Sequence, residues 1–141
     1  SEILMLADLK VLDLKGNRVS LNFGKIPSDS KLETLRLSNT GISSLVGLSR
    51  ANALKYFHAT NNEIRSIPEE LYSMIGLESL FLSYNSIAGS ISSNFGRMTN
   101  LRELYMFGNH LTGQIPSEFG NLVNITELVL GRNFLSGTIP E

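Results

Sequence analysis

The chain has 141 residues, a formal net charge of −1 and no cysteine. This length corresponds to about one domain, and the missing cysteines exclude disulfides, cysteine-based zinc sites and a cysteine nucleophile. Because 12 basic side chains balance 13 acidic ones, we expect neither nucleic acid nor a membrane surface as a direct partner, and no apolar run approaches the roughly 20 residues of a membrane span.

Leucine and asparagine are in excess, with 23 and 13 copies. They follow the frame L-x-x-L-x-L-x-x-N, which first occurs as Leu9, Leu12, Leu14 and Asn17. The later copies are Leu32, Leu35, Leu37 and Thr40; Leu54, Phe57, Ala59 and Asn62; Leu77, Leu80, Leu82 and Asn85; Leu101, Leu104, Met106 and Asn109; and Ile125, Leu128, Leu130 and Asn133. Their final positions lie 23, 22, 23, 24 and 24 residues apart, which indicates a repeat protein.

Each copy of the frame predicts one short strand, because its second and third apolar residues alternate with polar neighbours. The first strand is expected around Leu12 and Leu14, and the others at the equivalent places. Since about 18 intervening residues bring the chain back in the same direction, the strands are predicted to lie parallel, about 4.8 Å apart, in one sheet.

The asparagine that ends the frame is predicted to satisfy backbone groups where the chain leaves the strand, because its amide both donates and accepts. This predicted ladder consists of Asn17, Asn62, Asn85, Asn109 and Asn133. Thr40 replaces the asparagine in the second copy. We therefore expect that turn to be held less completely, or by water.

The segments that follow the last three frames share a second pattern. Residues 111–116 read L-T-G-Q-I-P, residues 135–140 read L-S-G-T-I-P, and residues 87–91 carry the partial version I-A-G-S-I. This L-x-G-x-I-P string resembles the plant-specific class of leucine-rich repeats, which is found in receptor-like kinases, receptor-like proteins and polygalacturonase-inhibiting proteins. The resemblance implies a second short strand in each string, with a turn at the glycine and proline at a sheet edge.

The expected fold is an α/β solenoid: a right-handed leucine-rich repeat superhelix with a concave parallel sheet and a convex side of irregular, 3-10 or short helical segments. Phe95, Met98, Phe119 and Leu122 have the three-residue spacing of 3-10 turns packed inward. The first three repeats lack the string. In the third, residues 68–71 (P-E-E-L) predict a helical turn with proline at its first position, and Gly24-Lys25-Ile26-Pro27 is out of register with the later strings.

The whole chain, 1–141, is predicted to be one domain of about six repeats. A solenoid needs polar caps over its terminal repeats, and neither end of this sequence supplies one. In the plant class the caps usually carry paired cysteines, which are missing here. We expect a piece of a longer solenoid; alternatively, neighbouring chains cover the ends, or the ends are tolerated.

Residues for catalysis are scarce. The two histidines, His58 and His110, occupy unrelated positions of the repeat, and the sequence has no metal-binding histidine pair, phosphate loop or nucleophile elbow. The pair Glu69 and Glu70 is typical of a solvated first helical turn. We therefore expect no enzyme, no metal and no cofactor.

The variable positions of the frame point away from the core, onto the concave face. Aromatic and histidine side chains gather there on repeats three to five: Tyr56, His58, Phe81, Tyr84, Tyr105 and Phe107. With rungs about 4.8 Å apart they fit a patch about 10–15 Å across. Charged residues flank it: Lys55, Glu78, Arg102, Glu103 and Arg132. This composition predicts a binding surface; the alternative is that the rings only stabilise the sheet.

One glycosylation sequon, Asn124-Ile125-Thr126, lies just before the last strand. It favours an extracellular location, although a chain with 13 asparagines contains a sequon by chance, and the missing cysteines favour the cytoplasm.

Three functions are compatible with these patterns. The first is a module of a cell-surface signalling receptor ectodomain that binds a protein or peptide ligand, or a co-receptor. The second is a secreted inhibitor that resembles the polygalacturonase-inhibiting proteins, against which the low charge of the concave patch counts. The third is an intracellular scaffold.

Overall fold

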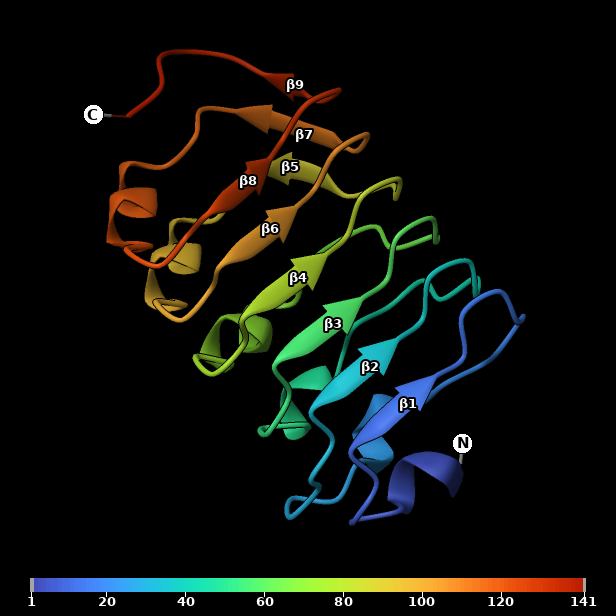
Figure 1. Cartoon of the computed structure of the whole chain (residues 1–141). Coiled ribbons are helices and arrows are strands. Elements are labelled where there is room, and N and C mark those ends of the chain that lie inside the picture. The colour runs from blue at the N-terminus through green and yellow to red at the C-terminus, as the bar shows by residue number, and fades with distance from the viewer. Residues whose placement is uncertain (1, 141) are drawn as a thin grey trace.

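The computed structural model describes residues 2–140. Its main feature is a six-stranded parallel sheet in which the strands follow one another along the molecule (Figure 1). The strands are β1 (Val11–Asp13), β2 (Thr34–Arg36), β3 (Tyr56–His58), β4 (Ser79–Phe81), β6 (Glu103–Tyr105) and β8 (Glu127–Val129). Each repeat therefore contributes one strand to this sheet, as the frame predicts.

The register of the sheet aligns the repeats position by position. The second apolar residue of each frame pairs with its equivalent in the next repeat, along Leu12, Leu35, Phe57, Leu80, Leu104 and Leu128. These side chains point into the coil. Leu35, Phe57 and Leu80 are fully buried, whereas Leu128 is 41% exposed because no described strand follows β8.

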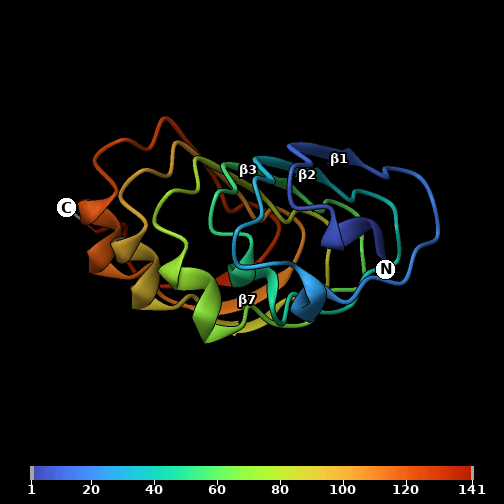
Figure 2. The same ribbon diagram turned by 90° about the horizontal axis from the view of Figure 1, so that it is seen from below.

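A second parallel sheet lies on another side of the coil. It consists of β5 (Ala88–Ser90), β7 (His110–Gly113) and β9 (Phe134–Leu135), in that order. In Figure 2, β7 lies across the coil from β1, β2 and β3. The L-x-G-x-I-P strings thus form strands, as the resemblance implies. The proline differs from expectation: Pro116 lies outside β7, as the N-cap residue of the helix that follows.

The remaining face carries short 3-10 helices. They are η1 (Glu2–Met5), η2 (Phe23–Lys25), η3 (Leu48–Arg50), η4 (Glu69–Ser73), η5 (Ser93–Arg97) and η6 (Ser117–Asn121). The segment P-E-E-L forms η4, but Pro68 is its N-cap residue and not its first helical residue. No helix among residues 2–140 is long and apolar enough to span a membrane. The fold is an α/β solenoid whose helical part is of the 3-10 type.

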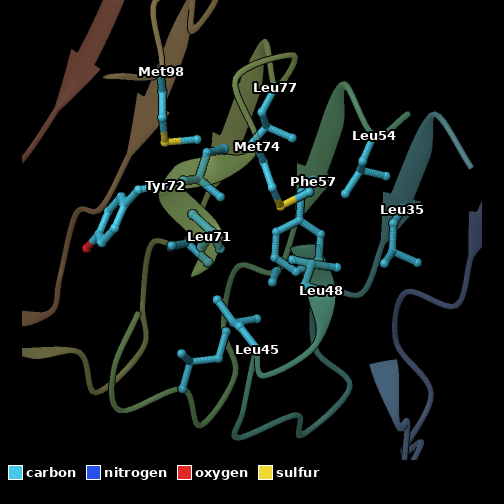
Figure 3. Close-up of a cluster of buried hydrophobic side chains, with 14 of the residues drawn as sticks. Leu35, Leu45, Leu48, Leu54, Phe57, Leu71, Tyr72, Met74, Leu77 and Met98 are labelled. Atoms are coloured by element: carbon cyan, nitrogen blue, oxygen red, sulfur yellow. The ribbon is translucent and has the colours of Figure 1, made fainter. Parts of the chain in front are cut away.

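One continuous hydrophobic core fills the coil between the two sheets and the 3-10 helices. Figure 3 shows side chains from neighbouring repeats, such as Leu48, Phe57 and Leu71, filling one region of it. Phe95 and Met98 are almost completely buried, and Phe95 contacts Tyr72 and Phe119 edge to face, with ring centroids 5.0 and 5.8 Å apart. Each buried leucine or phenylalanine contributes about 1.5–3 kcal/mol, so the repeats hold one another in place.

The asparagine ladder joins consecutive repeats, as predicted. Asn85 shows the pattern: its Nδ2 donates to the carbonyls of Leu82 in its own repeat and Ala59 in the preceding one, both at 3.0 Å, and its Oδ1 accepts from the Ile64 amide at 3.0 Å. Asn109 and Asn133 repeat these three bonds one and two rungs later. Asn17 bonds to carbonyls of its own turn, since no described repeat precedes it.

The turn at Thr40 differs from expectation. The Thr40 hydroxyl donates to the Leu37 carbonyl at 2.6 Å, and the residue is buried. Asn62, in the next repeat, accepts hydrogen bonds from the Thr40 and Gly41 amides at 3.0 and 2.8 Å and donates to Leu37 at 2.8 Å. The turn is therefore held by the asparagine that follows it, and no water is needed.

Candidate functional site

Three rings on the concave face contact one another across adjacent strands. His58, Phe81 and Tyr105 pair in register on β3, β4 and β6. The His58 and Phe81 rings are parallel within 4°, with centroids 4.2 Å apart, and the Phe81 and Tyr105 centroids are 4.5 Å apart. We call these three residues the ring ladder. It forms a continuous, half-buried row of rings, in which the Tyr105 ring is tilted by 48° from the Phe81 ring.

Two further aromatic residues lie where the strands end. The Tyr84 and Phe107 rings meet at 5.3 Å and 69°, and the Arg132 guanidinium lies 5.5 Å from the centre of the Phe107 ring. This is within the range of a cation–π contact. We call Tyr84, Phe107 and Arg132 the turn cluster. It places a cation at the C-terminal side of the aromatic surface.

Tyr84 has an unusual backbone conformation. Its position is left-handed in every repeat, and glycine or asparagine occupies it in four of the other five, at Gly16, Asn39, Asn61 and Gly108. Tyr84 and Arg132 adopt φ values of 54° and 52° there, which costs about 1–3 kcal/mol for such side chains. A Cβ atom on Gly108 would lie 3.1 Å from the Tyr84 ring, so this glycine leaves room for the tyrosine.

Tyr56 lies in the neighbouring column of the concave face, where its register partner is Ser79. Its hydroxyl is 3.4 Å from a carboxylate oxygen of Glu78, and the residue is 38% exposed. The structure thus divides the six predicted binding residues into the ring ladder, the aromatic part of the turn cluster, and Tyr56 beside them.

The ring ladder carries no charge at neutral pH. Burial, together with the nearby positive charge of Arg36, lowers the pKa of His58 below its usual 6.5, so the imidazole is neutral. Tyr105 donates a hydrogen bond to the Glu127 carboxylate, which raises the pKa of the phenol. Such a neutral aromatic surface suits apolar and aromatic side chains of a ligand.

Charged residues border the aromatic surface, largely as predicted. Arg102 pairs with Glu78 at 3.7 Å and Lys55 with Glu33 at 3.8 Å, and these exposed pairs contribute little stability. Glu103 accepts a hydrogen bond from Ser79 Oγ at 2.5 Å. Arg132, which was also expected beside the patch, lies over the ring of the patch residue Phe107.

The second histidine lies away from the concave face. His110 begins β7, and its ring faces that of Phe134 at 6.1 Å, on the second sheet and away from His58. Among residues 2–140, no three histidine, aspartate or glutamate side chains are grouped as a metal site.

Asn124 is exposed, and its Nδ2 donates to the Thr99 carbonyl of the preceding repeat at 2.8 Å. Asn100 makes the equivalent bond to Ile75 at 2.8 Å. Both asparagines thus link consecutive repeats at the turn before the strand. Glycosylation of Asn124 stays a prediction.

Comparison with known proteins agrees with the repeat geometry. The family model described as "Leucine rich repeat" matches residues 52–111. The chain is a leucine-rich repeat protein. A comparison with curated proteins gives no significant match.

Solved structures resemble the chain over nearly its whole length. The ectodomain of the Arabidopsis thaliana receptor kinase GASSHO1/SCHENGEN3, in complex with CASPARIAN STRIP INTEGRITY FACTOR 2, has 30% identity and a TM-score of 0.86 over 96% of this chain and 17% of that one. The plant peptide hormone receptor RGFR1, in complex with RGF2, has 33% identity and a TM-score of 0.87 over 96% and 22%. A leucine-rich repeat protein of Leptospira interrogans has 27% identity and a TM-score of 0.70 over 95% and 40%.

This leucine-rich repeat protein therefore resembles the ectodomains of plant receptor kinases. It spans about a fifth of the length of the two receptor ectodomains.

Proposed function

We propose that the concave face of repeats three to five binds a protein or peptide ligand, through the ring ladder, Tyr56 and the turn cluster. The observation that carries this proposal is the continuous row of ring contacts between His58, Phe81 and Tyr105 across three strands, on the face that the core does not use. Aromatic residues at the centre of a patch, with charged residues around it, are the usual composition of an interface.

The backbone of Tyr84 supports binding over the alternative that the rings only stabilise the sheet. Asparagine occupies the same left-handed position in repeats two and three, at Asn39 and Asn61. A tyrosine at φ 54° is strained, and it exposes 52% of its surface. Strain kept at an exposed aromatic side chain is a common feature of binding sites, whereas a purely structural role favours the relaxed residue.

We propose further that the chain is a segment of a cell-surface receptor ectodomain with a signalling role, and that its partner is a peptide ligand or a co-receptor. The similarity to a plant receptor kinase ectodomain in complex with CASPARIAN STRIP INTEGRITY FACTOR 2, and to a plant peptide hormone receptor in complex with RGF2, supports this assignment. An extracellular location and a glycan on Asn124 are part of the same proposal. The proposed activity is recognition and not catalysis.

The binding surface can be tested without knowing the natural ligand. Random 12-residue peptides displayed on messenger RNA are selected for binding to the intact chain, and the tightest peptide is titrated by calorimetry. The Phe81→Ala/Tyr105→Ala variant should weaken binding at least about 30-fold, which corresponds to about 2 kcal/mol. Phe134→Ala is the matched control, because Phe134 is also an exposed aromatic residue (66% exposed) but lies on the second sheet.

The two outcomes are distinct. Loss of affinity in the concave variant alone supports the proposal. Equal affinity of the concave variant and the wild-type chain, or loss only in the Phe134 variant, contradicts it.

A further inference from the structure

Charged side chains on the concave face pair with opposite charges of the next repeat. Pairs of this kind among residues 2–140 are Asp13 with Arg36 at 3.7 Å, Glu33 with Lys55 at 3.8 Å and Glu78 with Arg102 at 3.7 Å. Opposite charges across neighbouring strands favour the pairing of the strands, and like charges oppose it. The sheet therefore arranges these charges in the favourable way.

Glu103 and Glu127 break this pattern. They are register partners on β6 and β8, so two carboxylates stand opposite one another on neighbouring strands. Among residues 2–140, no lysine, arginine or histidine nitrogen lies within 4.0 Å of either carboxylate. Their repulsion is thus not offset by a basic side chain from this part of the chain, and a cation from outside would relieve it.

Two hydroxyl groups hold these carboxylates in place. Ser79 Oγ donates to Glu103 Oε2 at 2.5 Å, and the Tyr105 hydroxyl donates to Glu127 Oε2. Both donors are themselves fixed, because Ser79 is buried and the Tyr105 ring contacts the Phe81 ring with centroids 4.5 Å apart. Each bond uses one carboxylate oxygen and leaves the other, Oε1, for a further donor.

The acidic pair adjoins the ring ladder. Tyr105 follows Glu103 by two residues on β6, so both side chains lie on the concave face, and Tyr105 also bonds to Glu127. Exposed carboxylates alone hold a cation weakly. Here the neighbouring ring offers a surface for the aliphatic stem of a basic side chain and attracts its charged end. The rings and the carboxylates together favour a basic side chain of a ligand.

The ligand set of this pair suits an organic cation better than a metal ion. Ca²⁺ takes about six to eight oxygen ligands, whereas Glu103 and Glu127 supply two carboxylates. No third acidic or histidine side chain among residues 2–140 groups with them as a metal site.

We propose that the ligand of the concave face carries an arginine whose guanidinium binds between Glu103 and Glu127, beside an aromatic or aliphatic side chain that lies on the ring ladder. This proposal rests on the proposed binding function of the concave face and names the chemistry of its ligand. Arginine suits the site better than lysine, because its planar guanidinium can donate to two carboxylates and stack on a tyrosine ring.

The geometry of the sheet also sets the spacing within the ligand. Phe81 lies on β4, whereas the carboxylates lie on the next two strands and two residues closer to the strand starts. With rungs about 4.8 Å apart and about 3.4 Å per residue, the two sites are about 10 Å apart. An extended peptide spans this distance in about three residues. The arginine should therefore stand two or three positions from the apolar residue.

The test uses the random 12-residue library, selected in parallel on the wild-type chain and on the Glu103→Gln/Glu127→Gln variant. Glutamine keeps an oxygen that accepts from Ser79 and Tyr105, but it removes the charge. Peptides selected on the wild type should contain arginine within three positions of an apolar residue at least twice as often as those selected on the variant. Equal frequencies overturn the proposal.

The tightest peptide from the wild-type selection gives a quantitative test. It should bind the Glu103→Gln/Glu127→Gln variant at least tenfold more weakly than the wild type. Each arginine of the peptide is then replaced by glutamine in turn. One replacement should weaken binding to the wild type at least tenfold but binding to the variant less than threefold, because its partner charges are already gone. Equal losses in both proteins overturn the proposal.

Glu69→Gln/Glu70→Gln is the matched control. It changes the net charge by the same amount, at two exposed carboxylates of η4 that lie outside the sheet. It should change the affinity for the same peptide less than threefold. A tenfold loss in this control would show that the overall charge of the protein, and not the pair on β6 and β8, controls binding, and it would overturn the proposal.

Two further measurements separate recognition from other roles. Removal of the like charges should leave the urea midpoint of unfolding unchanged or raise it, and a lower midpoint would assign the pair a structural role and overturn the proposal. A peptide that loses affinity for the Phe81→Ala/Tyr105→Ala variant but not for the Glu103→Gln/Glu127→Gln variant overturns this inference and leaves the proposed function intact. A peptide that binds both variants like the wild type contradicts both.

Discussion

The imidazole of His58 lies parallel to the ring of Phe81, with centroids 4.2 Å apart and planes within 4°. The two residues are register partners on neighbouring strands. Because the stacked imidazole is half-buried and close to Arg36, its neutral form is favoured. The stack is therefore sensitive to pH.

Acidification should weaken the fold through His58. Its pKa is lowered in the folded chain relative to the usual 6.5, so between these two values the unfolded chain binds more protons. The contribution of neutral His58 to the free energy of unfolding is complete above pH 6.5. It is lost as the pH falls toward the pKa of His58 in the folded chain. His58→Phe keeps a stacking ring and should remove this part of the pH dependence in urea unfolding. An NMR titration midpoint of His58 above 6.5 would contradict the assignment.

The strain at Tyr84 gives a second prediction. Tyr84→Asn introduces the residue that repeats two and three have at the same left-handed position. The stability should stay within about 1 kcal/mol of the wild type, because relief of the strain offsets the loss of ring contacts, while affinity for the selected 12-residue peptide falls at least about fivefold. Chemical denaturation and calorimetry measure the two quantities. A large loss of stability with unchanged affinity would assign Tyr84 a structural role.

The asparagine ladder predicts a contrast between two positions. Asn85→Ala leaves the buried amide of Ile64 and the carbonyls of Ala59 and Leu82 without these partners, and it should destabilise the chain by about 3 kcal/mol or more. Asn17 is exposed and bonds only within its own turn. Asn17→Ala should therefore change the unfolding free energy by less than about 1 kcal/mol. Equal effects in urea unfolding would show that the inter-repeat bonds carry little energy.

The turn at Thr40 allows a test in the opposite direction. An asparagine at this position could donate to the Leu14 carbonyl, as Asn62 does to Leu37, and so join the first two repeats. Thr40→Asn should then raise the unfolding free energy by about 0.5–1.5 kcal/mol. A loss of stability would show that the new side chain does not compensate for the hydrogen bond that the Thr40 hydroxyl donates to the Leu37 carbonyl.

Much of this fold could be predicted because the frame repeats with little variation. The alternation at Leu12 and Leu14 predicts a strand, and equal spacing in the next repeat predicts its register. The hydrogen bonds of Asn85, Asn109 and Asn133 could be predicted from the same frame, since each asparagine has equivalent neighbours.

Features that depend on a contact between side chains of different repeats could not be predicted from the repeat frame. The turn at Thr40 is completed by Asn62, 22 residues later. The contact of Arg132 with Phe107 depends on side-chain conformation. The third repeat contributes no strand to the second sheet, and its segment from Asn62 to Pro68 is one residue shorter than the equivalent segment from Asn109 to Pro116. The strained backbone of Tyr84 did leave a signal in the sequence. Tyrosine stands at a turn position that glycine or asparagine occupies in most of the other repeats.

The most direct test of the proposed binding face is the location of the selected 12-residue peptide on the protein. Intermolecular NOEs are measured between the unlabelled peptide and the ¹³C-labelled chain. We predict contacts to ring protons of Phe81, Tyr105 and Phe107, with few or none to the second sheet. Contacts confined to the 3-10 helices or to β5, β7 and β9 would contradict the proposal that the concave aromatic surface is the binding site.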